Sequence, residues 1–307
     1  MRILAIGECM AEMAPTDAPS TYQLGFAGDT FNTAWYLAQL TPETPLSYFT
    51  AVGDDAISSQ MLDSMRESGV NTQQVRIVPN RSVGLYLITL NNGERSFTYW
   101  RGQSAARLLA QDKQALAHAM TQPDLIYFSG ITLAILNPEG RAALLDVAQS
   151  ARRAGKRIAF DPNLRPHLWD SPSEMTENIM QAAAVSDIAL PSFEDEARWF
   201  SDLNPAATLQ RYARAGAETI IVKNGAEAVL YRTRGAEGSV HVPPLASVVD
   251  TTAAGDSFNA GILAGLATDT PLPDSIALAC KLAGHVVQGK GALVPINQSL
   301  LDSCPQP

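Results

Sequence analysis

Short apolar segments alternate with helical patterns along most of the chain. The apolar segments are typical of buried strands, and they span residues 2–7, 47–53, 124–130, 157–163, 187–192 and 219–225. The helical patterns lie between them, at 55–69, 138–155, 172–186 and 205–216, with Pro near the first turn or Gly at the end of several. Strands that alternate with helices predict βαβ units, a parallel sheet and therefore an α/β fold. Ligands of such sheets bind at the C-terminal ends of the strands.

One segment, residues 83–101, breaks this alternation. Its apolar and polar residues alternate at period two, and Asn92-Gly93 supplies a turn, which together predict a β-hairpin with no helix in it. We expect this hairpin to form a small β flap beside the main sheet. The alternative is an antiparallel edge of the same sheet.

Composition limits the classes of protein that fit. The chain has 307 residues, of which 46% are hydrophobic and 17% charged, enough for a large globular α/β domain. No apolar stretch approaches the roughly 20 residues of a membrane span. The N-terminal apolar run is too short for a signal peptide and is interpreted as a first strand. The net charge of −9 argues against nucleic acid and anionic membranes as partners.

Cysteine usage bears on the compartment. Cys9, Cys280 and Cys304 are odd in number and far apart, and no Cys/His metal pattern is present. Free thiols and a cytoplasmic location are therefore expected.

The segment DTTAAGDSF, residues 250–258, carries the strongest chemical signal. Small residues at 252–255 precede an apolar helical pattern, and the bare N-terminus of a helix lets an anion approach its unpaired N–H groups. Asp256 follows this turn. It could be a simple N-cap, but a cap does not require the small residues before it. An anion hole beside a carboxylate suits phosphoryl transfer, in which the carboxylate takes the proton of the attacking hydroxyl.

Other nucleotide and hydrolase motifs are missing. The sequence contains no GxxxxGK[ST], GxGxxG, HExxH or GxSxG pattern. A P-loop or protein-kinase type of enzyme and a dehydrogenase are therefore disfavoured.

Residues 250–263 resemble the C-terminal signature of the ribokinase-like (PfkB) carbohydrate kinases. The segment AGDTFNTA, 27–34, is similar to the family's Gly-Gly-x-x-x-Asn-x-Ala, with Ala27 replacing the first Gly, and the closing GKGA at 289–292 also matches. The resemblance covers nearly the whole chain. It implies one kinase domain over 1–307: a ribokinase-like αβα sandwich with a mostly parallel central sheet and a small β-sheet lid. The lid is expected from segments near 9–15 and 83–101.

The resemblance also implies ATP, Mg²⁺ and site residues. Asp256 is then the catalytic base, and the backbone of Ala253, Ala254 and Gly255 forms the anion hole. Asp250 and Thr252 resemble the ligands of a monovalent cation such as K⁺, acting largely through backbone oxygens. The residues expected to contact the nucleotide are Lys223, Asn224, Gly225, Ala279 and Ala283.

The chain departs from the family pattern at 190–197. The family has Asn-x-x-Glu here, which organises Mg²⁺ and its waters, whereas this chain reads LPSFEDEA. The candidates for these roles are Ser192, Glu194, Asp195 and Glu196. The alternative is that the acids begin a solvated helix, at its favourable end.

The substrate site is expected to include residues of the two family-like motifs, at 27–34 and 250–263, and of the hairpin. By the resemblance Gly28, Asp29 and Asn32 hold sugar hydroxyls, although Asp29 could instead cap the following helix. In an alternating strand Tyr99 and Arg101 share one face.

Arg165 follows the segment 157–163, at a C-terminal strand end. Two Arg that converge on the sugar site would suit a carboxylate, which a guanidinium grips through two hydrogen bonds; structural salt bridges are the alternative.

These residues are most similar to the 2-keto-3-deoxygluconate kinase branch of the family. That resemblance implies a binding set of Tyr86, Tyr99, Arg101 and Arg165, with a backbone contact from Ile131. The expected reaction is ATP-dependent phosphorylation of the terminal hydroxyl of 2-keto-3-deoxygluconate, giving 2-keto-3-deoxy-6-phosphogluconate. A homo-oligomer formed through the lid is also expected. A kinase for a neutral sugar, such as fructose or ribose, and a non-catalytic sugar sensor are the alternatives.

Overall fold

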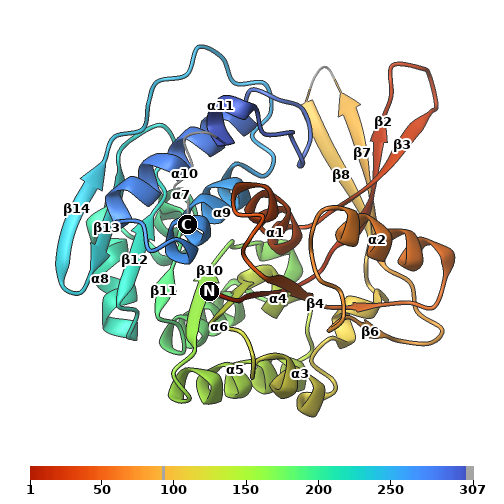
Figure 1. Cartoon of the computed structure of the whole chain (residues 1–307), viewed down its shortest axis with the longest axis horizontal. Coiled ribbons are helices and arrows are strands. Elements are labelled where there is room, and N and C mark those ends of the chain that lie inside the picture. The colour runs from red at the N-terminus through yellow and green to blue at the C-terminus, as the bar shows by residue number, and fades with distance from the viewer. Residues whose placement is uncertain (92–93, 302–307) are drawn as a thin grey trace.

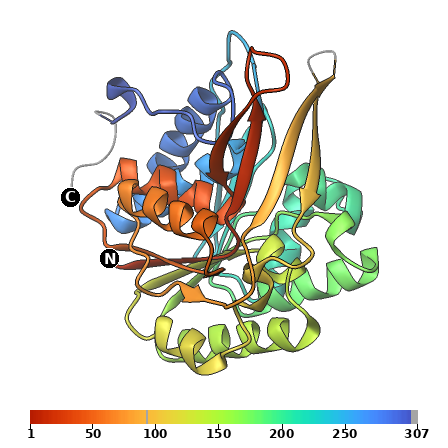
Figure 2. The same ribbon diagram turned by 90° about the vertical axis from the view of Figure 1, so that its right-hand side faces the viewer.

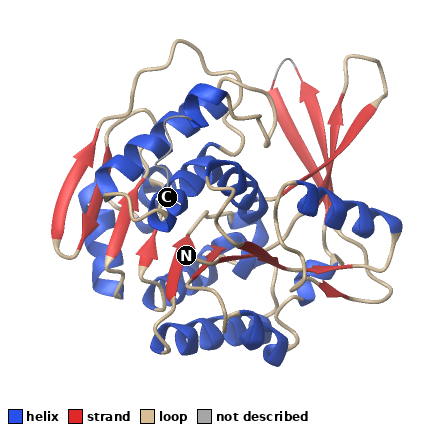
Figure 3. Ribbon diagram, in the orientation of Figure 1, coloured by secondary structure: helices blue, strands red, loops and turns tan. Residues whose placement is uncertain are grey.

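A central eight-stranded sheet lies between two layers of helices in the computed structural model, which describes residues 1–91 and 94–301 (Figures 1 and 3). The strand order is β14-β13-β12-β11-β10-β9-β1-β4. Six strands are parallel: β1 (Ile3–Ile6), β4 (Leu46–Phe49), β9 (Leu125–Ser129), β10 (Arg157–Asp161), β11 (Ile188–Ala189) and β12 (Thr219–Val222). The antiparallel hairpin of β13 (Val229–Thr233) and β14 (Ala236–Val240) closes one edge.

The six apolar segments all contribute parallel strands, as the sequence predicts, but one of them is divided. Within 47–53 the main-sheet strand β4 ends at Phe49, and β5 (Ala51–Val52) pairs instead with β6 (Arg76–Ile77) in a separate two-stranded sheet. The β13–β14 hairpin was not expected from the sequence.

Side chains of the central strands alternate between two hydrophobic cores, because successive residues of a strand point to opposite faces. Along β1, Ile3 and Ala5 join one core, whereas Leu4 and Ile6 join the other. Helices on the first face are α1 (Asp29–Leu40), α2 (Ala56–Glu67), α9 (Ala254–Ala267), α10 (Leu272–Val286) and α11 (Gln298–Leu301).

The second face is covered by the helices of the middle of the chain. These are α3 (Lys113–Ala119), α4 (Gly130–Ala134), α5 (Pro138–Arg153), α6 (Pro172–Ala184), α7 (Phe193–Phe200) and α8 (Pro205–Ala215). Two short 3₁₀ turns, at Ala105–Leu108 and Pro166–Leu168, complete the helical elements of the described residues. The αβα sandwich expected from the sequence is therefore present.

A second, four-stranded sheet stands at one end of the sandwich, and we call it the lid sheet (Figures 1 and 2). Its order is β3 (Tyr22–Ala27), β2 (Met10–Pro15), β7 (Gly84–Asn91) and β8 (Glu94–Trp100). The flap prediction is thus confirmed, and the alternative of an edge on the main sheet is wrong. The turn assigned to Asn92-Gly93 lies outside the described residues.

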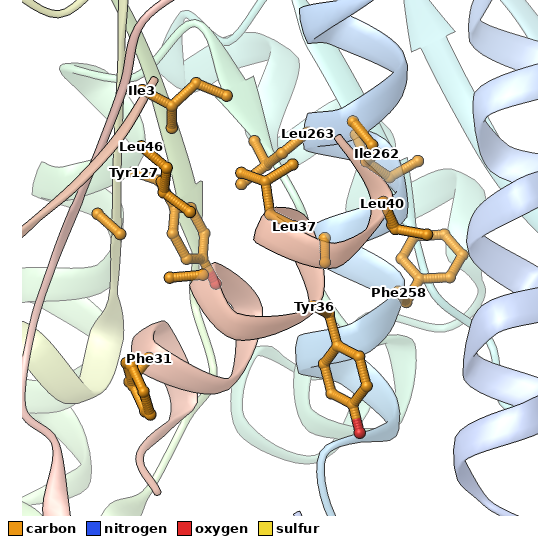
Figure 4. Packing of buried hydrophobic residues seen from close by; sticks show 14 of the residues in the cluster. Ile3, Phe31, Tyr36, Leu37, Leu40, Leu46, Tyr127, Phe258, Ile262 and Leu263 are labelled. Carbon is orange, nitrogen blue, oxygen red and sulfur yellow. The ribbon is translucent and has the colours of Figure 1, made fainter. Parts of the chain in front are cut away.

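Helix α9 is held tightly between α1 and α10 (Figure 4). Tyr36 and Leu37 of α1 meet Phe258 and Ile262 of α9 in the first core. On the other side α10 approaches so closely that a Cβ on Gly261 would lie 2.6 Å from the Cα of Ala279. This packing fixes the position of the N-terminus of α9.

No helix in the described part of the chain is both long and apolar enough to cross a bilayer. Cys9 and Cys280 are free thiols, and Cys304 lies outside the described residues.

Candidate active site

A cleft of about 1400 Å³ opens between the lid sheet and the C-terminal ends of the central strands. It runs from Tyr86 and Tyr99 on the lid sheet, past the first turn of α9, to Ala283 and Gln288 at the end of α10. Most of the residues singled out in the sequence line this cleft. The first turn of α9 thus lies between the two ends of the cleft.

The N-terminus of α9 faces the middle of the cleft. The helix begins at Ala254 after the N-cap residue Ala253, whose φ of 59° is left-handed and which makes no side-chain cap hydrogen bond. Thr252 to Asp256 all line the cleft. The alternative of Asp256 as N-cap is wrong, because Asp256 lies inside the first turn. A helix N-terminus of small residues can bind an anion through its backbone N–H groups.

Asp256 projects from this turn toward α1. Its Oδ2 accepts a hydrogen bond of 2.8 Å from Nδ2 of Asn32, and its backbone carbonyl accepts one of 3.1 Å from Oγ1 of Thr33. The carboxylate is partly exposed to the cleft, yet desolvation by the surrounding protein, aided by the charge of Asp29, raises the pKa of Asp256 to about 7. A pKa near the working pH suits a general base.

Lys223 is a cation close to Gly255 of this turn. Its Nζ donates to Asp161 at 3.2 Å and to Oδ1 of Asn259 at 3.2 Å, and a Cβ on Gly255 would lie 3.6 Å from it. Nδ2 of Asn259 in turn donates to Asp161 at 2.6 Å. The ammonium is therefore fixed where it can meet an anion held by α9.

Sequence reasoning missed Asp161 and Asn259. Asp161 ends the apolar strand β10, and a polar residue at that position of a parallel sheet is a signal that could have been used. Asn259 is the last polar residue of α9, whose residues beyond it are apolar, and only its polarity distinguishes it there.

Gly28, Asp29 and Asn32 lie at the start of α1, under the lid sheet. Gly28 lies against the connection between β1 and β2, since a Cβ there would lie 2.1 Å from the backbone oxygen of Glu8. The side chain of Asp29 accepts hydrogen bonds of 2.8 Å from the backbone of Thr30 and of 2.8 Å from Asn163. Gly28, not Asp29, is the N-cap of α1, so the capping alternative for Asp29 is wrong.

Arg101 ends the lid hairpin and is held by a carboxylate that the sequence did not indicate. The side chain of Glu8 is 1% exposed and forms an ion pair with Nη2 of Arg101. The other Glu8 oxygen accepts a hydrogen bond of 2.5 Å from Oγ of Ser104. The buried Nε of Arg101 has no hydrogen-bond partner among the described residues. A buried donor of this kind is costly unless a ligand satisfies it.

Arg165 and Arg101 act on the same end of the cleft. Arg165 is 43% exposed and donates to the backbone of Leu164 at 2.8 Å. His167, which stacks on Tyr99 with ring centroids 6.2 Å apart, has its pKa lowered first by burial and then by the charges of Arg165 and Arg101. The guanidinium of Arg101 lies 5.9 Å from the centroid of the Tyr99 ring, and Arg165 lines the same cleft with Tyr99 and His167.

The remaining predicted substrate residues line the same region. Tyr86 donates a hydrogen bond to Glu12 and packs against Tyr99, with ring centroids 5.8 Å apart. Ile131 lies at the start of α4 and also lines the cleft. Glu12 was not expected from the sequence.

Some of the residues predicted to contact the nucleotide lie at the far end of the cleft. Asn224, Gly225 and Ala283 line the cleft. Ala279 does not: it is 0% exposed and packs against Gly261 of α9, so its assignment to the nucleotide is corrected. Helix α10 has one face toward the cleft and another toward the core. Cys280 and Ala283 line the cleft, whereas Ala279 lies in the core.

The acids of α7 divide in the same way. Ser192, Glu194 and Asp195 line the cleft, whereas Glu196 is 0% exposed and lies in the interior. Its carboxylate pairs with Arg211 at 2.5 Å and accepts a hydrogen bond of 3.0 Å from the hydroxyl of Tyr212. The assignment of Glu196 to Mg²⁺ is therefore corrected. Burial and a paired guanidinium explain the position of this side chain.

Glu194 keeps a position that fits a metal. Mg²⁺ retains several waters and takes one or two carboxylates together with phosphate oxygens. The described residues contain no group of three or more His, Cys, Asp or Glu that could hold a metal ion.

Asp250 connects three segments next to α9. Its Oδ1 accepts hydrogen bonds from the backbone and side chain of Thr252, at 3.1 and 2.7 Å, and its Oδ2 accepts one of 2.7 Å from the backbone of Gly291. Arg95 of the lid sheet pairs with the same oxygen at 2.6 Å. Burial opposes ionisation, but these contacts outweigh it and lower the pKa of Asp250. Its side-chain oxygens are thus engaged, and only backbone oxygens remain for a monovalent cation.

Known proteins resemble the chain over nearly its full length. A 2-dehydro-3-deoxygluconokinase of Dickeya dadantii (strain 3937) is 39% identical over 304 residues, which cover 96% of this chain and 97% of that protein. A fructokinase of Rhizobium leguminosarum bv. trifolii is 34% identical over 280 residues, 88% of this chain and 81% of that protein.

A solved structure agrees on the architecture. The fructokinase of Xylella fastidiosa with bound ATP superposes with a TM-score of 0.83 at 22% identity, covering 99% of this chain and 95% of that one. The ribokinase-like fold expected from the sequence is thereby confirmed. The sequence profile described as pfkB family carbohydrate kinase matches residues 1–299. The chain therefore belongs to the pfkB family of carbohydrate kinases.

Proposed function

We propose that this enzyme transfers the γ-phosphoryl group of ATP to the terminal hydroxyl of a sugar acid, and that the sugar acid is 2-keto-3-deoxygluconate. The observation that carries the proposal is the order in which charged and reactive groups lie along the cleft. A carboxylate with a pKa of about 7 and a helix N-terminus lie in its middle, and two guanidinium groups lie at its lid end. The name of the Dickeya dadantii relative supports the same substrate.

Each part of the cleft then has a chemical task. The sugar acid lies under the lid sheet, with its carboxylate toward Arg101 and Arg165 and its terminal hydroxyl toward Asp256. Asp256 removes the hydroxyl proton as the oxygen attacks phosphorus. The backbone N–H groups at Ala254 and Gly255, with Lys223, stabilise the negative charge that moves in the transition state. The lid sheet keeps water from the reacting phosphoryl group.

ATP and Mg²⁺ complete the proposal. Asn224, Gly225 and Ala283 lie where the nucleotide would bind, and Glu194 is the acid best placed to hold Mg²⁺ through water. Bound Mg²⁺ would neutralise charge on the phosphate oxygens. A monovalent cation such as K⁺, held by backbone oxygens near Asp250 and Thr252, remains part of the proposal.

The test is a competition among acceptors. Purified enzyme is given MgATP with 2-keto-3-deoxygluconate, gluconate, fructose or ribose, in the presence and absence of K⁺, and ADP release is followed. We expect kcat/KM for the keto-deoxy acid to exceed that for each neutral sugar by about a hundredfold or more, since two charged hydrogen-bonding groups would meet its carboxylate. Equal or better use of fructose or ribose would overturn the choice of substrate. No ADP release with any sugar would favour a sugar sensor.

A kinase for a neutral sugar is the second candidate. The observation in its favour is that Arg101 already has a carboxylate partner, Glu8, which neutralises much of its charge. The fructokinase relative points in the same direction. Under this alternative Arg165→Ala would lower kcat/KM for fructose and for the sugar acid by similar factors.

We also propose that two copies associate through the outer face of the lid sheet. Strand alternation and register place six apolar side chains on that face: Met13, Leu24, Phe26, Leu85, Leu87 and Trp100. Of these, Leu24 is 39% and Trp100 57% exposed. An apolar sheet face of this kind is typical of an interface. Sedimentation should give a dimer, and Leu24→Lys with Trp100→Lys should give a monomer; a wild-type monomer would contradict the proposal.

The cytoplasmic location remains an expectation from cysteine usage.

A further inference from the structure

We propose that Glu8 is a positioning residue that sets the preference for a sugar acid by acting through Arg101. The proposal rests on the function proposed above and names a determinant of that same site. Glu8 lies in the short connection between β1 and β2, where the chain passes from the central sheet to the lid sheet. It lies two residues from each of these strands, and Arg101 directly follows the lid strand β8.

The contacts of Glu8 leave its carboxylate little freedom. Its residue exposure is 2%, one carboxylate oxygen holds Nη2 of Arg101, and the other accepts the hydrogen bond from Ser104. Gly84 leaves space for this arrangement, because a Cβ there would lie 2.9 Å from Oε1 of Glu8 and 3.2 Å from Cβ of Arg101. A side chain would displace both partners of the ion pair.

The ion pair determines which donor of Arg101 remains for a ligand. Nη2 is taken by Glu8, and Nε is enclosed by protein without a hydrogen-bond partner among the described residues, which leaves Nη1 as the nitrogen that can face a ligand. Arg101 thus offers a directed N–H at a fixed position. Because a guanidinium is planar and its donors have a fixed geometry, holding one nitrogen fixes the direction of the others.

The two Arg residues at this end of the cleft have different roles. Glu8 compensates Arg101, so that a buried guanidinium is tolerated before any ligand arrives. Arg165, which is 43% exposed and has only a distant carboxylate, Asp195 at 4.0 Å, retains more of its positive charge. Arg165 then attracts the carboxylate of the sugar acid, and Arg101 selects its orientation. Glu8 is the residue that makes Arg101 directional.

The main experiment replaces the charge of Glu8 without changing its size. With Glu8→Gln, Arg101 loses its charged anchor, and we expect KM for the sugar acid to rise about tenfold while kcat changes less than about threefold. KM for ATP should stay at the wild-type value, because the nucleotide lies beyond α9. The ratio of kcat/KM for the acid to that for fructose should fall by about the same tenfold factor.

A double-mutant cycle separates action through Arg101 from a general structural effect. In an Arg101→Ala background, Glu8→Gln should change kcat/KM by less than about twofold, because the partner is already gone. A loss in that background as large as in wild type would overturn the proposal. So would an equal rise of KM for ATP.

Two further variants act as controls. Glu196→Gln also replaces a buried carboxylate paired with an Arg, but it lies outside the cleft, and it should leave the ratio of acid to neutral sugar at the wild-type value. Ser104→Ala removes only the second partner of Glu8 and should raise KM about threefold or less.

A binding measurement keeps the test decisive if the variants lose activity. Without ATP, the sugar acid should raise the Tm of the wild-type enzyme and raise that of Glu8→Gln clearly less at the same concentration. Equal Tm shifts would contradict the proposal. If the wild-type enzyme neither binds nor phosphorylates sugar acids, the proposed function is wrong. If it prefers sugar acids but Glu8→Gln does not change that preference, only the inference about Glu8 is wrong.

Discussion

Asp256 and Glu196 make an instructive pair of carboxylates. Each lies in the first turn of a helix, α9 or α7, and desolvation raises the pKa of each to about 7. Glu196 is fully buried, and Arg211 and Tyr212 engage both of its oxygens. Asp256 lines the cleft and has one side-chain donor, Asn32.

The difference shows what a raised pKa means at each place. At Glu196 the protein supplies the partners, so the perturbed carboxyl is part of the interior. At Asp256 the neighbouring Asp29 adds repulsion, and an oxygen remains accessible from the cleft. A perturbed pKa therefore marks a reactive group only where a substrate can reach it.

The largest effect should come from removing the base. Asp256→Asn keeps the shape of the side chain but cannot accept the hydroxyl proton, so we expect kcat to fall about a thousandfold. The thermal shift caused by ATP should be retained, because the N-terminus of α9 is unchanged. Steady-state kinetics and differential scanning fluorimetry measure the two quantities. Activity within about tenfold of wild type would remove Asp256 from the role of base.

The opposite result is expected when the interior pair is broken. Arg211→Met leaves Glu196 and Asp202, which Arg211 also contacts at 2.5 Å, without their cation. We expect the free energy of unfolding to fall by about 3 kcal/mol, from urea denaturation, because two buried carboxylates lose their partner. kcat/KM should stay near the wild-type value below the melting temperature. A loss of turnover greater than the loss of folded protein would contradict the separation of the two carboxylates.

The pH dependence should follow Asp256 alone. The base must be ionised to act, so kcat/KM for the sugar, at saturating MgATP, should be constant above a pKa of about 7. Below it kcat/KM should fall by about tenfold per pH unit, as one proton binds. Glu196→Gln should leave this profile unchanged. A profile that shifts in Glu196→Gln would show that the interior carboxylate is coupled to the reaction.

The smallest effect concerns the free energy of unfolding that the protein loses when Asp256 ionises. Its pKa is raised in the folded protein above the unfolded value of about 3.9, so the folded state holds the proton more tightly between these two values. Its contribution to stability is therefore most favourable below about pH 4 and is lost as the pH rises through 7.

Asp256→Asn removes this loss. We expect the variant to be more stable than wild type near pH 8, by on the order of 1 kcal/mol after allowance for partial exposure, with the difference vanishing near pH 4. Urea denaturation at both pH values measures it. A less stable Asp256→Asn near pH 8 would contradict the desolvation of this carboxyl.

Periodicity along the chain was enough to predict the central sheet. Buried parallel strands are apolar throughout, so β1, β9 and β10 stand out from their surroundings. The β13–β14 hairpin was missed because its segment, VLYRTRGAEGSV, is only partly buried and lacks that continuous apolar pattern. The break between β4 and β5 depends on a change of pairing partner, which no local pattern records.

The candidate site could be predicted where a motif is local, and less well where the fold decides which way a side chain points. The DTTAAGDSF segment gave Asp256 and its turn directly. Three successive acids at the start of α7 did not reveal that Glu196 faces the interior, because that depends on Arg211 from another helix. Glu8 escaped notice for the same reason: its partners, Arg101 and Ser104, are more than ninety residues away, with separations of 93 and 96.

The backbone at Ala253 has a consequence for how this sequence can drift over evolutionary time. An L-residue at a φ of 59° is sterically disfavoured, and β-branched side chains are disfavoured most. In the proposed mechanism the turn acts through backbone N–H groups, so its chemistry would not depend on a side chain at this position. Selection therefore has a narrow choice here: Ala carries a steric cost, Gly would be free of it, and most other exchanges would be eliminated before their effect on catalysis was ever tested.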